Sequence, residues 1–220
     1  MVTDDLQLPE DLALDPTTAP LAGKATPLPP GNWEIVVKKY DRVKLDKNGY
    51  PQLKTVKGRT YQQALLTSFQ VVSPFPYDKK VVYPFQPILT VPQQRQGKFY
   101  TQLYDLLLAY DQTKGVSGVE EGLDLAVQYV ASEQPIRVHT TLEAVDMDYV
   151  RSFDGREQTK EEKNEMWTKA RMNVREFISP TGQVLHSVTG PSGNLIEPRC
   201  VINVFYPSEA KVKLGPDSER

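Results

Sequence analysis

The sequence predicts a mainly β fold with a helical insertion (β+α), arranged as a small, partly closed barrel. Three observations lead to this prediction. Apolar and polar residues alternate in a strand-like pattern from Trp33 to Val91, apolar residues recur at helical spacing between about 98 and 132, and the alternation returns from Ile136 to Tyr206. Strands on both sides of a central helical piece are typical of a barrel with a helix across one end, or of a sandwich with a helical insertion.

Length and composition bound the organisation of the chain. At 220 residues with a net charge of −2, it suits one domain with tails. We expect an acidic, proline-rich, disordered lead over 1–31, a single domain over 32–207 and a polar tail over 208–220. The acidic balance excludes a protein that coats nucleic acid by bulk charge, so a nucleic-acid site must be local.

Cysteine and hydropathy indicate the compartment. The single cysteine, Cys200, excludes an internal disulfide and fits a reducing environment. The chain has no apolar run of membrane-spanning length and no signal-peptide pattern. We therefore expect a soluble, cytoplasmic protein (in the host cytoplasm if the protein is viral) without a membrane partner.

The first predicted strand, Trp33–Leu45, carries the most informative pattern. One face is apolar but is interrupted by Lys39 and Asp41; its apolar members are Trp33, Ile35, Val37, Val43 and Leu45. The opposite face holds Glu34, Val36, Lys38, Tyr40, Arg42 and Lys44. Basic groups neutralise phosphates and aromatic rings stack on unpaired bases, so this row predicts a single-strand nucleic-acid surface. The alternative is a solvated edge strand.

The remaining early elements follow from turn signals. Asn48-Gly49 predicts a tight turn. Tyr61–Val72 is a second strand candidate, with a helix over Gln62–Leu66 as the alternative. Lys79–Val91 is a third strand, which its prolines confine to an edge or break.

The later half begins with two predicted helices, over Phe99–Tyr110 and Val119–Ser132. The strands that follow are expected near Ile136–Ala144, Met172–Ile178, Gln183–Val188 and Arg199–Tyr206. A charged segment, about 148–170, lies between the first two of these strands, with an exposed helix over Glu157–Ala170. This segment is either a flap over the bound strand or a solvated loop with Trp167 packed onto the core.

The predicted interface gathers around the first hairpin, where basic residues exceed acidic ones and tyrosines are interleaved. Its members are Lys38, Tyr40, Arg42, Lys44, Tyr50, Lys54, Lys57, Arg59 and Tyr61. A second group, Arg171, Arg175 and Phe177, repeats the pattern on the predicted strand near 172–178. The alternatives are a solvated hairpin tip for the first group and chance alternation for the second.

Catalysis and metal binding have little support in the sequence. The histidines are His139 and His186, and Cys200 lies in an apolar strand where a buried inert thiol is the usual role. The spacing of ligand-type residues predicts no zinc site, and Asp146 with Asp148 is weak evidence for magnesium. We expect no catalytic residue, no metal and no cofactor.

The pattern resembles bacteriophage single-stranded DNA-binding proteins with an oligonucleotide/oligosaccharide-binding (OB) fold. The resemblance rests on Pro29–Val37, Leu65–Val72, Lys98–Leu108 and Asn173–Ile178. It implies an OB-like five-stranded Greek-key barrel with extra strands and flexible tails. It also implies a non-catalytic, sequence-tolerant protein that coats exposed single-stranded DNA in DNA replication and recombination. Implied partners are single-stranded DNA, replication or recombination proteins and further copies of the chain.

The chain departs from that family at its end, where Asp217-Ser-Glu-Arg220 follows two lysines instead of forming an acidic tip. This departure leaves recruitment of partners through the C-terminus in doubt. The acidic lead is an alternative recruiter, or an occupant of the basic surface. Two other functions stay open: a structural or adaptor protein (a virion or assembly component), and an enzyme such as a nuclease.

Overall fold

The computed structural model describes residues 27–56, 58–84, 86–89, 93–95, 98–100, 102–111, 115–116, 118–181, 183–207 and 209–217. The chain divides into two compact units. The larger contains Leu28–Glu143 and Arg199–Arg220, and the smaller contains Ala144–Pro198. Most of the predicted disordered lead lies outside the described residues. Leu28 is buried, so the core begins slightly before the predicted start of the domain.

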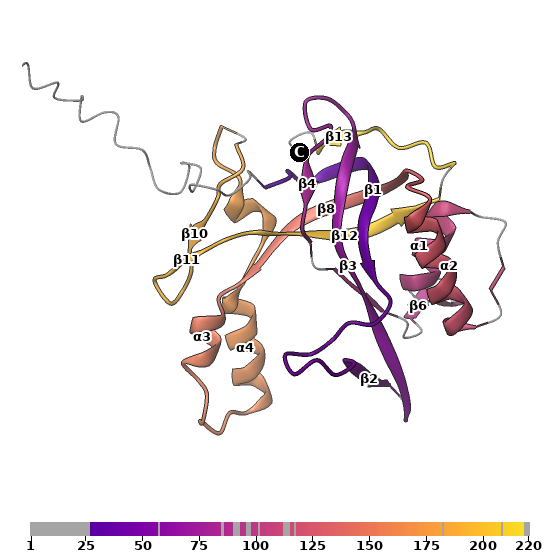
Figure 1. Cartoon of the computed structure of the whole chain (residues 1–220). Helices are drawn as coiled ribbons and strands as arrows, with labels where there is room; N and C mark the ends of the chain where they lie inside the picture. Colours follow the sequence, from indigo (N-terminus) through magenta and orange to yellow (C-terminus); the bar gives the residue numbers. More distant parts are fainter. Residues whose placement is uncertain are drawn as a thin grey trace, which may run out of the picture. The chain divides into compact units, whose positions relative to one another are not determined.

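The larger unit is built on an antiparallel sheet with strand order β12-β8-β1-β3-β2 (Figure 1). The main strands are β1 (Gly31–Asp41), β2 (Leu53–Val56), β3 (Arg59–Ser73), β8 (Ile136–Val145) and β12 (Arg199–Tyr206). The short strands β4 (Val81–Val82) and β5 (Gln86–Leu89) also pair with β3, and β13 (Gly215–Pro216) pairs with β1. A separate hairpin joins β6 (Gln93–Arg95) to β7 (Lys98–Tyr100). The mainly β fold with a helical insertion is confirmed.

The sheet does not close into a hydrogen-bonded barrel. No pairing joins β5 to β12 among the described strands. Instead, Ile202 N on β12 donates a hydrogen bond of 3.2 Å to the side-chain Oε1 of Gln86 on β5. A side chain thus takes the place of a ladder between these two strands.

Several predicted strands change length in the structure. The strand expected over Trp33–Leu45 ends at Asp41, and the one expected over Lys79–Val91 becomes β4 and β5. Pro84 lies between these two pieces, and a proline cannot donate a ladder hydrogen bond. The last strand, β12, has the predicted bounds.

The core forms where one face of the sheet meets two helices, α1 (Gln102–Tyr110) and α2 (Val119–Ala131). Both helices were predicted from their apolar spacing. Trp33 is fully buried, and its Nε1 donates to Thr140 Oγ1 at 2.9 Å, which satisfies the indole N–H inside the core. We call the sheet face that carries Trp33 the core face, and the opposite one the outer face.

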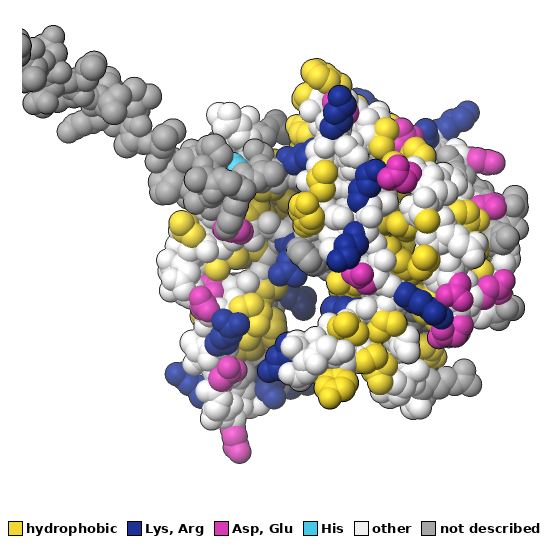
Figure 2. All heavy atoms as spheres, viewed as in Figure 1, with side chains coloured by type: hydrophobic (Ala, Val, Ile, Leu, Met, Phe, Trp, Pro, Cys, Tyr) yellow, Lys and Arg dark blue, Asp and Glu magenta, His cyan; other side chains and the backbone are white. Residues whose placement is uncertain are grey.

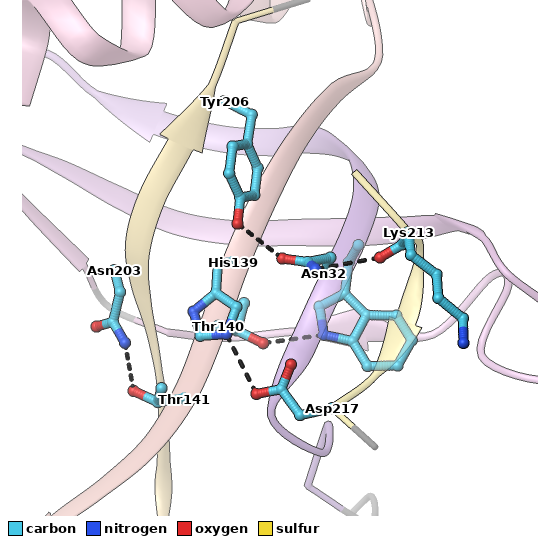
Figure 3. A network of polar contacts seen from close by, with 9 residues as sticks. Asn32, His139, Thr140, Thr141, Asn203, Tyr206, Lys213 and Asp217 are labelled. Carbon is cyan, nitrogen blue, oxygen red and sulfur yellow. Dashed lines mark hydrogen bonds and ion pairs between the residues drawn. The ribbon is translucent and has the colours of Figure 1, made fainter. Parts of the chain in front are cut away.

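The C-terminal segment is fastened to the sheet (Figure 3). Tyr206 Oη donates to Asn32 Oδ1 at 2.9 Å, and Asn32 Nδ2 donates to Lys213 O at 3.1 Å. His139 Nε2 lies 3.2 Å from Asp217 Oδ2. Residues predicted only as a polar tail are therefore tied to β1 and β8, near the start of β1.

The smaller unit contains the helices α3 (Met147–Arg151) and α4 (Lys160–Ala170), the 3-10 turn η2 (Val174–Phe177) and short strands. The strands are β9 (Arg171–Met172), β10 (Val188–Thr189) and β11 (Leu195–Ile196). Thr159 and Glu162 form a capping box that begins α4, in agreement with the predicted helix. None of the described helices has the length and apolar character needed to cross a membrane.

Candidate nucleic-acid interface

The first hairpin forms an arm, residues 42–62, that carries much of the predicted basic excess. Asp46 shapes its turn: Oδ1 accepts from the backbone N–H groups of Asn48 at 2.8 Å and Tyr50 at 3.0 Å. Gly49 has φ +83°, which glycine adopts without strain. The predicted tight turn is confirmed, and this turn leaves the Tyr50 side chain 69% exposed.

The register of β2 on β3 decides which arm residues share a face. Lys54 is paired with Tyr61, and Val56 with Arg59. Directly opposed residues of an antiparallel pair project to the same face. β3 turns Ala64 to the core, so Tyr61, three positions earlier, lies on the outer face. Lys54, Tyr61 and the backbone position of Arg59 therefore belong to one outer surface.

A β-bulge overturns the predicted orientation of Tyr40. The pairing of β1 with β3 shifts register between Val37 and Lys39 and again between Lys39 and Tyr40. An extra residue reverses the alternation of side chains, so Tyr40 comes opposite the fully buried Leu66. The Tyr40 ring packs against the core, and burial raises the pKa of its hydroxyl, so Tyr40 does not lie on the outer face where strand alternation placed it.

Lys38 and Arg42 are held by acidic groups near α2. Lys38 Nζ lies 2.6 Å from Glu133 Oε1, and Arg42 contacts Glu120 at 2.5 Å and Asp124 at 3.2 Å. Figure 2 shows basic and acidic side chains beside one another in the region of α2. A cation that already has carboxylate partners gains less from a phosphate, so these two residues are weaker candidates than the sequence indicated.

The same bulge brings Lys39 to the outer face, where the sequence did not place it. Lys39 pairs with Ser68, the neighbour of the core residue Phe69. Val82 of β4 also pairs with Phe69, so Tyr83 follows on the outer side and is 62% exposed. Lys39 and Tyr83 thus flank β3 on its outer face. They add a cation and a ring to the surface that Lys54 and Tyr61 begin.

This outer face also carries an acidic residue. Asp41 pairs with Leu65, and Thr67 Oγ1 donates to Asp41 Oδ2 at 2.8 Å. The carboxylate repels phosphates locally, although its hydrogen bond with Thr67 disperses part of its charge.

The arm carries an apolar group as well. Leu45, Tyr50 and Leu53 are each more than half exposed. Figure 2 shows hydrophobic side chains gathered over β2 and the loop before it. Exposed apolar side chains gathered in one place are typical of a contact surface.

Three further members of the predicted first group are Lys44, Lys57 and Arg59. The backbone N–H of Lys44 donates to Gln63 O, which joins the arm to β3. Lys57 lies outside the described residues, as does the side chain of Arg59.

The second predicted group does not form a strand face. Only Arg171–Met172 is extended, and Val174–Phe177 is a 3-10 turn begun by Asn173, whose side chain accepts from Arg175 N at 2.9 Å. Arg171 and Arg175 are exposed, but Phe177 is fully buried. The predicted alternation is wrong there, and Phe177 is a core residue.

Cys200 and Asp146, which the sequence offered for catalysis and for metal binding, are both buried in the structure. Burial raises the pKa of the Cys200 thiol to about 12, so it is not a thiolate at neutral pH. No group of three or more ligand-type residues gathers within the described ranges. Burial of Asp146 raises the pKa of its carboxyl, but hydrogen bonds from Tyr149 N and Ser192 N outweigh burial and hold that pKa below its ordinary value.

The comparisons with known proteins identify no relative. No family model matches the chain. A search of curated proteins and a search of solved structures likewise give no match.

Proposed function

We propose that this protein binds single-stranded DNA without catalysing a reaction, and that the outer face of β3 with the adjoining arm is its interface. One observation carries the proposal: Lys54 and Tyr61 at the arm lie on the same sheet face as Lys39 and Tyr83. Lysines that track a phosphate backbone, together with rings that accept any base, are the usual elements of a sequence-tolerant single-strand surface.

The state of the cations supports the proposal. Among the described residues, Lys39 and Lys54 have no carboxylate partner, whereas Lys38 and Arg42 do. An unpaired lysine on a sheet keeps its full attraction for phosphate. Binding therefore releases counterions and weakens as salt rises.

Strand order supports an OB-like barrel as the finer description of the fold. Because β5 also pairs with β3, the neighbouring strands of the sheet can be read as β5-β3-β1-β8-β12, which is the strand order of an OB barrel. The difference from a closed barrel is at β5 and β12, where the Gln86 side chain bonds to β12 in place of a strand pairing. The helices α1 and α2 come between β5 and β8 in the chain. In OB folds the second and third strands and the first hairpin loop bind oligonucleotides, and these correspond here to β3, β5 and the arm. The resemblance adds coating of exposed strands in replication or recombination as the expected role.

A fluorescence-anisotropy titration with labelled oligo(dT) at two salt concentrations tests the proposal. We expect saturable binding that weakens steeply with salt, weaker binding of a duplex of equal length, and similar affinity for other single-stranded sequences. Parallel titrations with oligo(U) measure the preference for DNA over RNA. Absence of binding at low salt would reject the proposal.

A second candidate function is an adaptor or structural role through protein contact. It is favoured by the exposed apolar group of Leu45, Tyr50 and Leu53 on the arm. Sedimentation velocity of the wild-type protein and a Leu45→Ser/Leu53→Ser variant tests it. Self-association that the variant loses, in a protein that binds no oligonucleotide, favours this role.

A further inference from the structure

The turn between β3 and β4 carries the most exposed aromatic residue among those described. Phe75 is 85% exposed and lies in Ser73-Pro-Phe-Pro76, between two prolines whose rings fix the backbone φ. A single exposed apolar residue is common on protein surfaces, but loop residues held outward by a rigid scaffold commonly bind ligands. The predicted interface did not include this residue.

Backbone hydrogen bonds hold this turn in one conformation. Tyr77 N donates to Pro74 O at 3.0 Å, Lys79 N donates to Val71 O at 2.8 Å, and Val71 N donates to Lys80 O at 2.9 Å. Because the turn is fixed before any ligand arrives, binding through Phe75 costs little ordering entropy.

A side chain anchors the same turn to the core. The Tyr77 ring packs edge-on against Trp33, with ring centroids 4.9 Å apart and planes at 65°. Tyr77 is therefore occupied by packing, whereas Phe75, two residues earlier, is directed to solvent. Within this one turn, the Tyr77 ring fixes the backbone to the core and the Phe75 ring is accessible to a ligand.

The outer face of β3 connects this turn to the arm. β3 runs without interruption from Arg59 at the arm to Ser73 at the turn. At about 3.3 Å per residue, the distance from Tyr61 to Ser73 is at most roughly 40 Å. Lys39 and Tyr83 lie along this face, and Lys79, which is exposed four residues after Phe75 in the same turn, supplies a further cation.

We propose, resting on the function proposed above, that Phe75 stacks on a base of the same bound strand and forms the far end of the interface. The bound strand then follows β3 from the arm to the turn. Its phosphates contact Lys54, Lys39 and Lys79, and its bases stack on Tyr61, Tyr83 and Phe75. The lysines along β3 and in the turn favour a nucleic acid over a protein as the occupant, because an apolar protein surface leaves these lysines without partners. A base inside a duplex is already stacked, so this contact requires an unpaired strand.

The test compares Phe75→Ala with Phe75→Tyr in the full chain, using labelled oligo(dT) of about 16 nucleotides. Loss of one stacked base weakens binding by roughly 5- to 150-fold, so we expect that loss for Phe75→Ala and near wild-type affinity for Phe75→Tyr. Val127→Ala, which trims an exposed apolar residue on α2, is the matched control and keeps full affinity. Thermal melts of all variants should agree, because Phe75 contributes little to the core.

An abasic oligonucleotide of the same length separates stacking from other effects. It keeps the phosphates but has no bases, so the penalty of Phe75→Ala should vanish on it, whereas the penalty of Lys54→Gln should remain. Equal affinity of Phe75→Ala and wild type for oligo(dT) would overturn the inference alone. A penalty that persists on the abasic strand, or a change only in self-association, would overturn it as well. If the wild-type protein binds no oligonucleotide, the proposed function itself fails.

Discussion

The contrast between paired and unpaired lysines gives a direct test of where phosphates bind. Lys39→Gln/Lys54→Gln removes two positive charges from the outer face of β3. Lys38→Gln/Arg42→Gln removes two charges that Glu133 and the acidic residues of α2 already neutralise. Both variants lose the same net charge, so differences between them report location and not bulk electrostatics.

The expected magnitude follows from counterion release. Each phosphate contact contributes about 0.7 to the slope of log affinity against log salt for a single strand. The Lys39/Lys54 variant should lower that slope by about 1.4, so that over a fourfold change in salt its affinity falls about sevenfold less than that of the wild type. The Lys38/Arg42 variant should keep the wild-type slope.

The assay is a series of anisotropy titrations with oligo(dT) at several salt concentrations, with folding checked by circular dichroism. If the Lys38/Arg42 variant lowers the slope as much as the Lys39/Lys54 variant does, the bound strand follows the row expected from strand alternation, and the assignment to the outer face is refuted.

Three further predictions concern single residues. Tyr40 Oη is buried without a hydrogen-bond partner among the described residues, so Tyr40→Phe should raise the free energy of unfolding by about 1 kcal/mol in urea titrations and leave oligonucleotide affinity unchanged. Asp41→Asn keeps an acceptor for Thr67 but removes a repulsive charge, so affinity should tighten by up to about fivefold in the same anisotropy assay. Because hydrogen bonds depress the pKa of Asp146, its carboxylate stabilises the protein above the ordinary pKa of 3.8 and this contribution is lost as pH falls through the folded-state pKa. The stability difference between wild type and Asp146→Asn in urea should therefore shrink below about pH 4.

Each of these predictions has a contrary result. Weaker DNA binding by Tyr40→Phe would mean that the hydroxyl reaches the ligand. Unchanged or weaker affinity of Asp41→Asn would move the bound strand away from the middle of β3. A stability difference that stays constant down to acidic pH would mean that Asp146 is not held ionised by its donors.

Alternation along the chain predicted the strands well where one face is buried. The strand β12 has the predicted bounds, and the apolar rows of β1 and β8 lie in the core as expected. The helices followed from the spacing of residues such as Leu103 and Leu107, because helical periodicity is a local property.

The candidate site was harder to predict because a bulge is not a local property of composition. Lys39 and Asp41 interrupted an otherwise apolar row, and the structure gives the reason: an added residue turns Lys39 outward and Tyr40 inward. An apolar row broken by charges is thus a sign of a register change as well as of a weak strand. This pattern is visible in the sequence, and interpreted as a register change it predicts Lys39, and not Tyr40, on the outer face.

Other differences depend on tertiary contacts. Phe177 alternates with arginines as a strand residue would, but Asn173 caps a 3-10 turn there and the ring is buried. Phe75 and Tyr83 each lie next to prolines, which break the strand pattern, so the sequence does not indicate that these two residues lie close to β3. That relation appears only when β4 pairs with Phe69 and Gln70. No local pattern predicts the contact between the side chains of Asp217 and His139, because 78 residues separate the two in the chain.

The most direct test of the proposed interface is ultraviolet cross-linking of the full chain to oligo(dT), followed by mass spectrometry of the linked peptides. Cross-links at Tyr61, Phe75 or Tyr83 are the predicted result, because these rings line the outer face of β3 and its turn. Cross-links confined to the smaller unit or to the region of α2, with none at those three residues, would contradict the account.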